Sequence, residues 1–576
     1  MNKSILLYLF LFNFLHATFS QNDFKTVFEK SNGTETATYP EVVSFYKKLA
    51  TQSEFVDLQE MGKTDSGELL HIAMYNSDKT FDFKDIRKDK TILLINNGIH
   101  PGESDGIDAT QLLFKDLVQR NIKIPANTVV ITIPIYNIGG ALNRNTTTRT
   151  NQNGPKAYGF RGNARNYDLN RDFIKNDTRN ALAFAEIFHK VQPDIFIDNH
   201  VSNGADYQYT LTHLFTQHNA LGGALGKYLH TEVRPSLERK LKVKNWDITP
   251  YVNVWGTTPD KGWAQFMDYP RYSTGYTSLW NTLGMMVETH MLKPYKQRVE
   301  GTYELLKIMI EIAEEKGSEI RSLRKEAFEF YQKQKVYLTN WKVDSTKNRI
   351  ITFKGYEGKT IPSAITTLPR LQYDQSLPYT KEVAYQDTFK PTLSINVPKA
   401  YVIPQGWWSV LERLKINEVE YQLLKKDTVI EVESYRISDY KTRKEAYEGH
   451  YLHEDTKVSR KTLKKAFNKG DIIVYTDQNS IRYLLETLEP EAIDSFFNWN
   501  FFDTILQQKE NFSPYVWEDK AAELLKKDLD LKDRFLNMKK DTIFNSNSNY
   551  QLDWIHKNSD YYEKAHLQYP IYRIIK

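Results

Sequence analysis

The chain has 576 residues, of which 40% are hydrophobic and 26% charged, and it carries a formal net charge of +5 and no cysteine. This length exceeds one compact domain, and the composition is that of a globular protein. The lack of cysteine excludes disulfides, thiolate catalysis, cysteine-ligated metals and a lipid anchor on cysteine. Because the net charge is small and no dense Lys/Arg tract is present, nucleic acid is not an expected partner.

The first residues have the layout of a cleaved secretory signal peptide. Lys3 gives a positive start, residues 5–15 are almost wholly apolar, and small residues follow at Ala17, Thr18 and Ser20. This pattern predicts a signal peptide over residues 1–20, with cleavage near Ser20–Gln21. The apolar run is shorter than the roughly 20 residues that cross a bilayer, so no membrane span is expected. We therefore expect an exported protein, either secreted or periplasmic.

From residue 39 onwards, patterns typical of helices and strands alternate. Apolar spacing predicts helices over 39–52, 104–119, 178–191 and 294–315, and strands over 69–75, 91–97, 127–137, 193–200 and 283–290. Continuous apolar strands between amphipathic helices indicate an α/β fold with a central, largely parallel sheet that is covered on both faces.

The character of the chain changes after about residue 330. Thr, Val, Tyr and Pro become more frequent through 335–440, where short runs resemble strands, and the stretch 479–540 is more helical. We therefore expect an N-terminal domain over 21–330 and a β-rich accessory domain with some helix over 331–576, whose role the sequence does not indicate.

Polar residues follow several of the predicted strands. His100 and Glu103 come after the strand at 91–97, His200 closes the strand at 193–200, and Glu288 lies in the strand at 283–290. Ligands of open α/β sheets bind beyond the carboxyl ends of the strands. Histidine and carboxylate ligands suit Zn²⁺, which takes three protein ligands and a water in catalytic sites. The alternative is structural: a turn and helix cap, and a histidine at the sheet edge.

A second polar motif, "NYDLNRDF", occupies residues 166–173. The guanidinium group of Arg171 can bind a carboxylate through two parallel hydrogen bonds, and the Asn170 amide can add a donor. The alternative is a local ion network of Asp168, Arg171 and Asp172 on the surface.

The ordered set of HPGE, DLNR, a later histidine and a glutamate on a terminal core strand resembles the zinc metallocarboxypeptidases, in particular the bacterial branch of the family of carboxypeptidase A. The resemblance covers residues 35–320. It implies a mixed eight-stranded sheet between helices, a bound Zn²⁺ ion, and removal of the last residue from peptides with a free C-terminal carboxylate.

The resemblance also implies roles for individual residues. It makes His100, Glu103 and His200 the zinc ligands, Asn170 and Arg171 the site for the terminal carboxylate of the substrate, and Glu288 the general base.

Two further roles are less firmly fixed by spacing. For the arginine that polarises the scissile carbonyl, Arg161 is the best match, with Arg165, Arg149 and Arg144 as alternatives. For the tyrosine that caps the substrate, Tyr276 is favoured over Tyr269 and Tyr272. The residues after the third ligand depart from the family, since they read "HVSNG" rather than a Ser-Tyr pair. His290 is expected to be structural.

Two other functions compete with a carboxypeptidase. One is a zinc amide hydrolase that acts on small acylated amino acids, which the export signal and the accessory domain disfavour. The other is a non-catalytic protein that binds peptides or glycans on a peptidase scaffold. The presence of all three predicted ligands and the predicted base argues against it.

Overall fold

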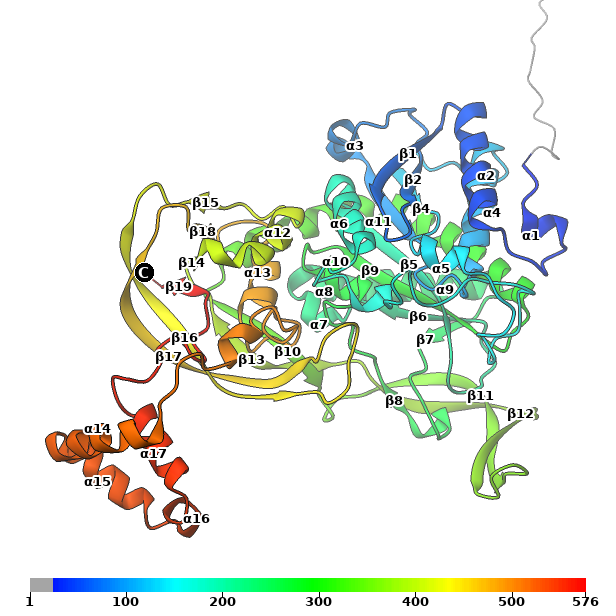
Figure 1. Cartoon of the computed structure of the whole chain (residues 1–576). Coiled ribbons are helices and arrows are strands. Elements are labelled where there is room, and N and C mark those ends of the chain that lie inside the picture. Colours follow the sequence, from blue (N-terminus) through cyan, green and yellow to red (C-terminus); the bar gives the residue numbers. More distant parts are fainter. Residues whose placement is uncertain (1–23, 576) are drawn as a thin grey trace, which may run out of the picture.

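The computed structural model describes residues 24–575, which form a helix-covered eight-stranded sheet and a β-rich C-terminal region (Figure 1). The predicted signal peptide, residues 1–20, lies outside the described residues. Across 24–575, no helix combines the length and the hydropathy that crossing a membrane requires.

The central sheet has the strand order β1-β2-β4-β3-β5-β9-β6-β7. The pairs β3–β4, β3–β5, β5–β9 and β6–β7 are parallel, and the pairs β1–β2, β2–β4 and β6–β9 are antiparallel. This confirms the expected mixed, largely parallel sheet of eight strands. The strands are β1 (Val56–Lys63), β2 (Leu69–Tyr75), β3 (Thr91–Asn96), β4 (Thr128–Ile133), β5 (Ile195–Ser202), β6 (Leu211–Phe215), β7 (Ile248–Pro250) and β9 (Leu283–His290).

Helices cover both faces of this sheet, and for that reason β3, β4 and β5 are buried along their whole length. Within β3, Leu93 and Ile95 pack on one face and Ile92 and Leu94 on the other. The first face is covered by α2 (Tyr39–Gln52), α4 (Asp105–Val118), α9 (Arg234–Val243) and α11 (Tyr295–Lys333), and the second by α6 (Arg179–Val191) and α10 (Ser273–Ser278). Shorter helices are α1 (Val27–Lys30), α3 (Phe83–Asp89), α5 (Ile138–Leu142), α7 (His218–Leu221) and α8 (Gly223–Tyr228).

The predicted helices are present, and one of them is longer than expected. The helix predicted over 294–315 continues as α11 to Lys333, because Ile320 and Leu323 extend its buried apolar stripe. The expected domain boundary at residue 330 therefore falls in the last turn of a continuous helix. The division of the chain into domains 21–330 and 331–576 stays a prediction.

The C-terminal region contains the expected strands together with some helix. Strand β10 (Val336–Val343) pairs with β13 (Phe389–Asn396), and the hairpin of β11 (Arg349–Pro362) and β12 (Pro369–Gln386) pairs with β8 (Trp263–Ala264). A six-stranded sheet contains, in spatial order, β15 (Gln422–Leu423), β18 (Ile472–Tyr475), β14 (Ala400–Ile403), β19 (Tyr572–Ile574), β16 (Thr428–Thr442) and β17 (His453–Phe467). The helices are α12 (Trp408–Ile416), α13 (Ile481–Leu488), α14 (Pro514–Lys527), α15 (Leu529–Met538), α16 (Thr542–Asn545) and α17 (Ser548–Lys557), of which the last four form a separate cluster (Figure 1).

The two halves of the molecule share one hydrophobic core. The buried cluster that contains Phe184 of α6 also contains Tyr483 of α13, and every residue of α13 is buried. From α13, Arg482 donates hydrogen bonds to the backbone oxygens of Ser278 at 2.7 Å and Ala220 at 2.8 Å. Because this core crosses from one half to the other, separating the halves would expose apolar surface on both.

A buried ion pair also joins the halves. Nε of Arg271 lies 2.8 Å from Oδ1 of Asp494, and the Arg271 backbone N–H donates to Oδ2 at 3.0 Å. Arg271 is 8% exposed and Asp494 is fully buried. Trp499 donates a further hydrogen bond to Oδ1 at 3.1 Å. The carboxylate of Asp494 therefore has its counter-charge on the other half of the chain.

We predict that Arg271→Ala lowers the free energy of unfolding by about 3–5 kcal/mol, since it leaves the Asp494 carboxylate buried without its partner. Urea denaturation followed by tryptophan fluorescence measures the effect. Arg534→Ala is the matched control, because Arg534 forms an exposed pair with Asp530 and its loss should leave the midpoint unchanged. Equal midpoints for the two variants would contradict the prediction.

Candidate active site

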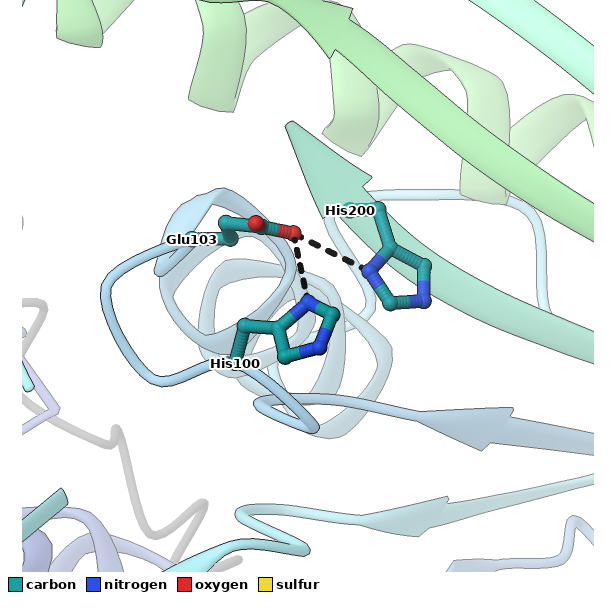
Figure 2. A group of neighbouring side chains, drawn as sticks. All are labelled: His100, Glu103 and His200. Atoms are coloured by element: carbon teal, nitrogen blue, oxygen red, sulfur yellow. Dashed lines mark hydrogen bonds and ion pairs between the residues drawn. The ribbon is translucent and has the colours of Figure 1, made fainter. Parts of the chain in front are cut away.

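Three side chains converge beyond the carboxyl ends of β3 and β5. His100 lies in the turn after β3, Glu103 precedes α4, and His200 lies near the end of β5. Oε2 of Glu103 is 3.3 Å from Nδ1 of His100 and 3.0 Å from Nδ1 of His200 (Figure 2). One potential ligand atom from each residue lies within 4.8 Å of the others. The three residues that the sequence marks as ligands are thus within reach of one cation.

The position of Glu103 depends on close packing between α4 and β5. Gly106 in the first turn of α4 lies so near Asn199 of β5 that a Cβ atom there would come within 2.3 Å of the Asn199 Cβ. The Glu103 carboxylate also accepts a hydrogen bond from the backbone N–H of Val201 at 3.0 Å. Because glycine allows the helix to approach the strand, Glu103 reaches His200 from a different element.

Two aspartates orient the histidines. Nε2 of His100 lies 2.8 Å from Oδ1 of Asp168, and Nε2 of His200 lies 3.0 Å from Oδ2 of Asp198. A carboxylate at Nε2 favours the tautomer with its proton there, which leaves the Nδ1 lone pair free. Two imidazole nitrogens and one carboxylate are a donor set that fits Zn²⁺. In the sequence, Asp198 lies two residues before His200 on the same strand face, which favours a structural partner, and Asp168 was considered only as part of a surface ion network.

The electrostatics of this cluster favour positive charge. Burial opposes ionisation of Glu103, but Arg149 and His100 hold the pKa of its carboxyl well below the usual range. Burial likewise opposes a charged His200, yet Asp198 and Glu103 raise its pKa well above the ordinary value. Carboxylates that stabilise a cationic imidazole would also stabilise a divalent cation between the same groups.

Glu288 lies beside His200, since the two residues are direct partners in the parallel pair β5–β9. Both residues line one cavity of about 350 Å³. Burial raises the pKa of Glu288 to about 8, the positive charge of His200 lowers it, and the negative charge of Glu103 raises it. A divalent cation held by the neighbouring ligands would lower this pKa further, and the carboxylate would then be ionised at neutral pH.

Asn170 and Arg171 line the same cavity. The Asn170 amide oxygen accepts a hydrogen bond from the Ser273 backbone N–H at 3.2 Å, which fixes the amide. The Arg171 guanidinium carbon lies 4.5 Å from the ring centroid of Tyr272, and Nη1 donates to the Asn170 backbone oxygen at 2.8 Å. A held guanidinium group in a cavity can bind a carboxylate of a ligand.

Of the four candidate arginines, Arg161 alone is among the residues that line the cavity. Its Nε and Nη2 donate to Oδ2 of Asp168 at 3.0 and 2.8 Å, while Nη1 lies 3.7 Å from Oε1 of Glu103. The others have different partners: Arg149 pairs with Glu103, whereas Arg144 and Arg165 donate to backbone oxygens.

The expectation for Tyr276 is wrong, because this side chain does not reach the cavity. Tyr276 is fully buried on α10, and its hydroxyl donates to Oδ1 of Asn417 at 2.6 Å inside the shared core. The Tyr269 hydroxyl donates to the Trp341 backbone oxygen at 2.7 Å. Tyr272, which the sequence analysis ranked lower, lines the cavity, and so does Tyr251, which that analysis did not consider.

His290 is held away from the ligand cluster, as expected for a structural residue. Its Nε2 lies 3.1 Å from Oδ1 of Asp206, and its ring lies 4.1 Å from that of Tyr207. These contacts fix the loop that follows β5.

One part of the cavity is apolar, and the sequence analysis did not identify it. Met286 and Leu214 are direct partners in the pair β6–β9, two residues before Glu288 on the same face of β9. Phe266 and Tyr272 also line the cavity and contact each other edge to face, with ring centroids 5.1 Å apart. An apolar group could therefore be bound next to Arg171.

Comparisons with known proteins identify relatives of the chain. A sequence model of the zinc carboxypeptidase family matches residues 42–194. The chain is 23% identical to carboxypeptidase 2 of Trichophyton rubrum over 496 residues, which cover 81% of this chain and 84% of that protein. Carboxypeptidase 2 of Trichophyton tonsurans is 32% identical over 106 residues, or 18% of this chain and 19% of that protein.

Solved structures with similarity to the chain have low identity to it. A metallo-carboxypeptidase from Burkholderia cenocepacia is 15% identical, with a TM-score of 0.36 over 48% of this chain and 68% of that chain. Carboxypeptidase A from Helicoverpa armigera is 15% identical, with a TM-score of 0.37 over 48% of this chain and 73% of that chain.

The family match includes two of the residue groups described above. Residues 42–194 contain His100 and Glu103 as well as Asn170 and Arg171, whereas His200 lies just beyond them. The match thus confirms the resemblance that the motifs HPGE and DLNR indicate. The chain is similar to the zinc carboxypeptidases over residues 42–194 and to a carboxypeptidase over 81% of its length, and these findings support a zinc-dependent metallocarboxypeptidase.

Proposed function

We propose that the chain is an exported carboxypeptidase that hydrolyses the last bond of peptides and prefers an apolar residue at their C-terminus. The observation that carries this proposal is the position of Arg171 in the same cavity as the three potential ligands and Glu288. A guanidinium group binds a carboxylate through two hydrogen bonds. Because a peptide has one main-chain carboxylate, at its end, this group would restrict cleavage to the last bond.

The ionisable residues of the cavity would divide the chemistry among them. His100, Glu103 and His200 would hold zinc, which lowers the pKa of water and polarises a carbonyl when it is bound. Glu288 would accept a proton from the attacking water and pass it to the leaving amine. Nη1 of Arg161, which does not take part in the bidentate pair with Asp168, would donate to the substrate carbonyl oxygen as negative charge develops there.

The apolar part of the cavity supports a preference for apolar C-terminal residues. A carboxylate bound to Arg171 would place the last side chain of the peptide beside Tyr272, Phe266, Met286 and Leu214, which line the same cavity. Every charged residue that lines the cavity is already assigned to the ligand cluster, the base, the carbonyl or the carboxylate. A charged side chain at this end of the peptide would therefore be desolvated without a partner.

Export rests on the predicted signal peptide over residues 1–20. An extracytoplasmic carboxypeptidase would act on scavenged peptides or on the stem peptides of a cell wall.

Zinc content tests the ligand assignment without an activity measurement. We expect about one zinc per chain after dialysis against metal-free buffer, and a loss of most of it in His200→Ala, because two ligands bind the ion far more weakly than three. His213→Ala is the matched control: His213 is buried in the same sheet but pairs with Glu238 at 3.1 Å. Equal zinc content in the two variants would refute the assignment of His200.

Mass spectrometry of a mixed peptide pool tests the proposed reaction. We expect losses of single residues from the C-terminus, with Phe, Leu and similar residues released fastest. A chelator should abolish these losses, and peptides with a C-terminal amide should stay intact because they cannot pair with Arg171. Internal cleavage would overturn the exopeptidase assignment, and preferential release of Lys, Arg, Asp or Glu would overturn the apolar preference.

The base is tested by Glu288→Gln, which keeps the shape of the side chain but cannot accept the proton. We expect kcat/KM to fall by about 100- to 10,000-fold, the usual contribution of a positioned base. Zinc content should stay unchanged, since Glu288 is not a ligand. Glu300→Gln on the exposed face of α11 is the control and should keep full activity. A Glu288→Gln enzyme within tenfold of the parent would show that the proton goes elsewhere.

A further inference from the structure

We propose that the C-terminal region completes the substrate site through the loop at residues 443–452, in which Tyr447 and Glu448 position Arg171 and Asp168. This inference rests on the proposed function, because it assigns these residues to the binding of the terminal carboxylate. The loop joins β16 to β17, and this long hairpin reaches from the C-terminal sheet to the N-terminal half (Figure 1).

The tip of the loop is a tight turn with a defined shape. Tyr447 and His450 exchange two backbone hydrogen bonds, at 2.7 and 3.1 Å, across the pair Glu448–Gly449. Glu448 has a φ of 49° and Gly449 a φ of 80°. Positive φ at both central positions is the pattern of a type I′ turn, which closes a hairpin without splaying its strands. The turn therefore presents Tyr447 and Glu448 from a fixed backbone.

Two contacts fix the tip on the N-terminal half. His450 Nε2 lies 2.6 Å from Oδ2 of Asp177. Gly449 approaches Tyr167 so closely that a Cβ atom at this position would lie 2.5 Å from the Tyr167 hydroxyl oxygen. Glycine is thus required twice, by its φ and by the space available. These contacts lie on the segment that leads into Asp168 and on the one that follows Arg171.

Glu448 acts on Asp168. Its Oε2 accepts a hydrogen bond from the Asp168 backbone N–H at 2.8 Å. The Asp168 side chain in turn binds Nε2 of His100 at 2.8 Å and the guanidinium group of Arg161. One carboxylate of the C-terminal region therefore holds the backbone of the residue that orients both a potential ligand and the proposed carbonyl donor.

Tyr447 acts on Arg171. Burial lowers the pKa of the Arg171 guanidinium group, whereas Asp168 and the nearby Tyr447 side chain raise it. The Arg271 guanidinium carbon lies 5.8 Å from the centroid of the Tyr447 ring. The Tyr447 ring stacks on Trp499, with centroids 6.0 Å apart and planes 19° apart. Trp499 is fully buried, so the stacked tyrosine has a rigid support. A residue of the C-terminal region is thus a neighbour of the proposed carboxylate anchor.

The physical benefit is the restriction of a flexible side chain. An arginine has many rotamers, and binding a carboxylate through two parallel hydrogen bonds requires one of them. Tyr272 covers the guanidinium group of Arg171 at 4.5 Å, and the Asn170 backbone oxygen accepts from Nη1. Tyr447 adds a neighbouring side chain from a third element. The guanidinium group is therefore fixed before the substrate arrives, and the substrate does not bear the entropy cost of ordering it.

The test compares Tyr447→Phe with Tyr451→Phe, in which the exposed Tyr451 of the same loop is changed. The phenylalanine keeps the stacked ring and removes only the hydroxyl. In Tyr447→Phe we expect the KM for peptides with a free C-terminus to rise about tenfold, the usual effect of one hydrogen bond to a charged group, while kcat stays within about twofold. Zinc content should not change, and Tyr451→Phe should match the parent enzyme. A purely structural role would lower the active fraction, and hence kcat, at constant KM.

Binding provides a readout that does not depend on hydrolysis. Calorimetry measures the affinity for two ligands, a tripeptide that ends in phenylalanine and the C-terminal amide of the same tripeptide. The two proteins compared are the Glu288→Gln variant and the same variant that also carries Tyr447→Phe. We expect the preference for the acid over the amide to fall about tenfold when the hydroxyl is absent. In a second pair of variants, Glu448→Ala should bind the tripeptide more weakly than the parent protein. Glu448→Gln should bind it about as well as the parent protein, because glutamine keeps an oxygen that can accept from the Asp168 N–H.

The outcomes separate the two proposals. If the parent enzyme releases C-terminal residues but KM and the acid preference are unchanged in Tyr447→Phe, the role of the loop is refuted and the proposed function stands. If the parent enzyme releases no C-terminal residue, the proposed function fails, and a loss of the acid preference in Tyr447→Phe still supports the contact between Tyr447 and Arg171.

Discussion

The parallel pairing of β5 with β3 on one side and β9 on the other is the constraint on which the candidate site depends. It brings the turn after β3 next to the end of β5 and makes Glu288 the direct partner of His200. Side chains alternate along a strand, so a slip of one residue would turn His200 or Glu288 to the opposite face of the sheet. Two residues earlier on the same face, Asp198 pairs with Met286. The same strand register therefore sets two neighbouring pairs of side chains. His200 and Glu288 form the pair at the proposed reaction centre. In the pair before it, Asp198 holds His200 and Met286 lines the apolar part of the cavity.

Much of this half could be predicted from the sequence because its signals are local. The apolar runs around Leu93 and Ile197 mark buried strands, and the polar residues that follow them mark the edge at which ligands bind. Strand order is a different matter, since it depends on pairings between distant segments. The short strands β6 and β7, which complete the sheet, carry too few residues for a periodic signal.

The errors at the site have a common physical origin. Spacing left three tyrosines open because it does not fix which face of the six-residue helix α10 meets the core, and Tyr276 faces Asn417, 141 positions further along the chain. The positions of Asp168 and Asp198 were visible in the sequence. Their hydrogen bonds to the imidazoles follow only from the three-dimensional arrangement. No local pattern marks Tyr447, since its importance comes from a hairpin that packs against a segment 276 positions before it.

Because a polypeptide is synthesised from its N-terminus, the two halves of the shared core become available at different times. Asp494, which neutralises Arg271, and helix α13, which fills the core beneath α10, are synthesised after all of the potential metal ligands. A partly made chain would have every ligand and every residue that lines the cavity, but Arg271 would lack its counter-charge and α10 would lack the core that packs against it. The packing and charge that support this half are thus complete only after residue 494 has been made.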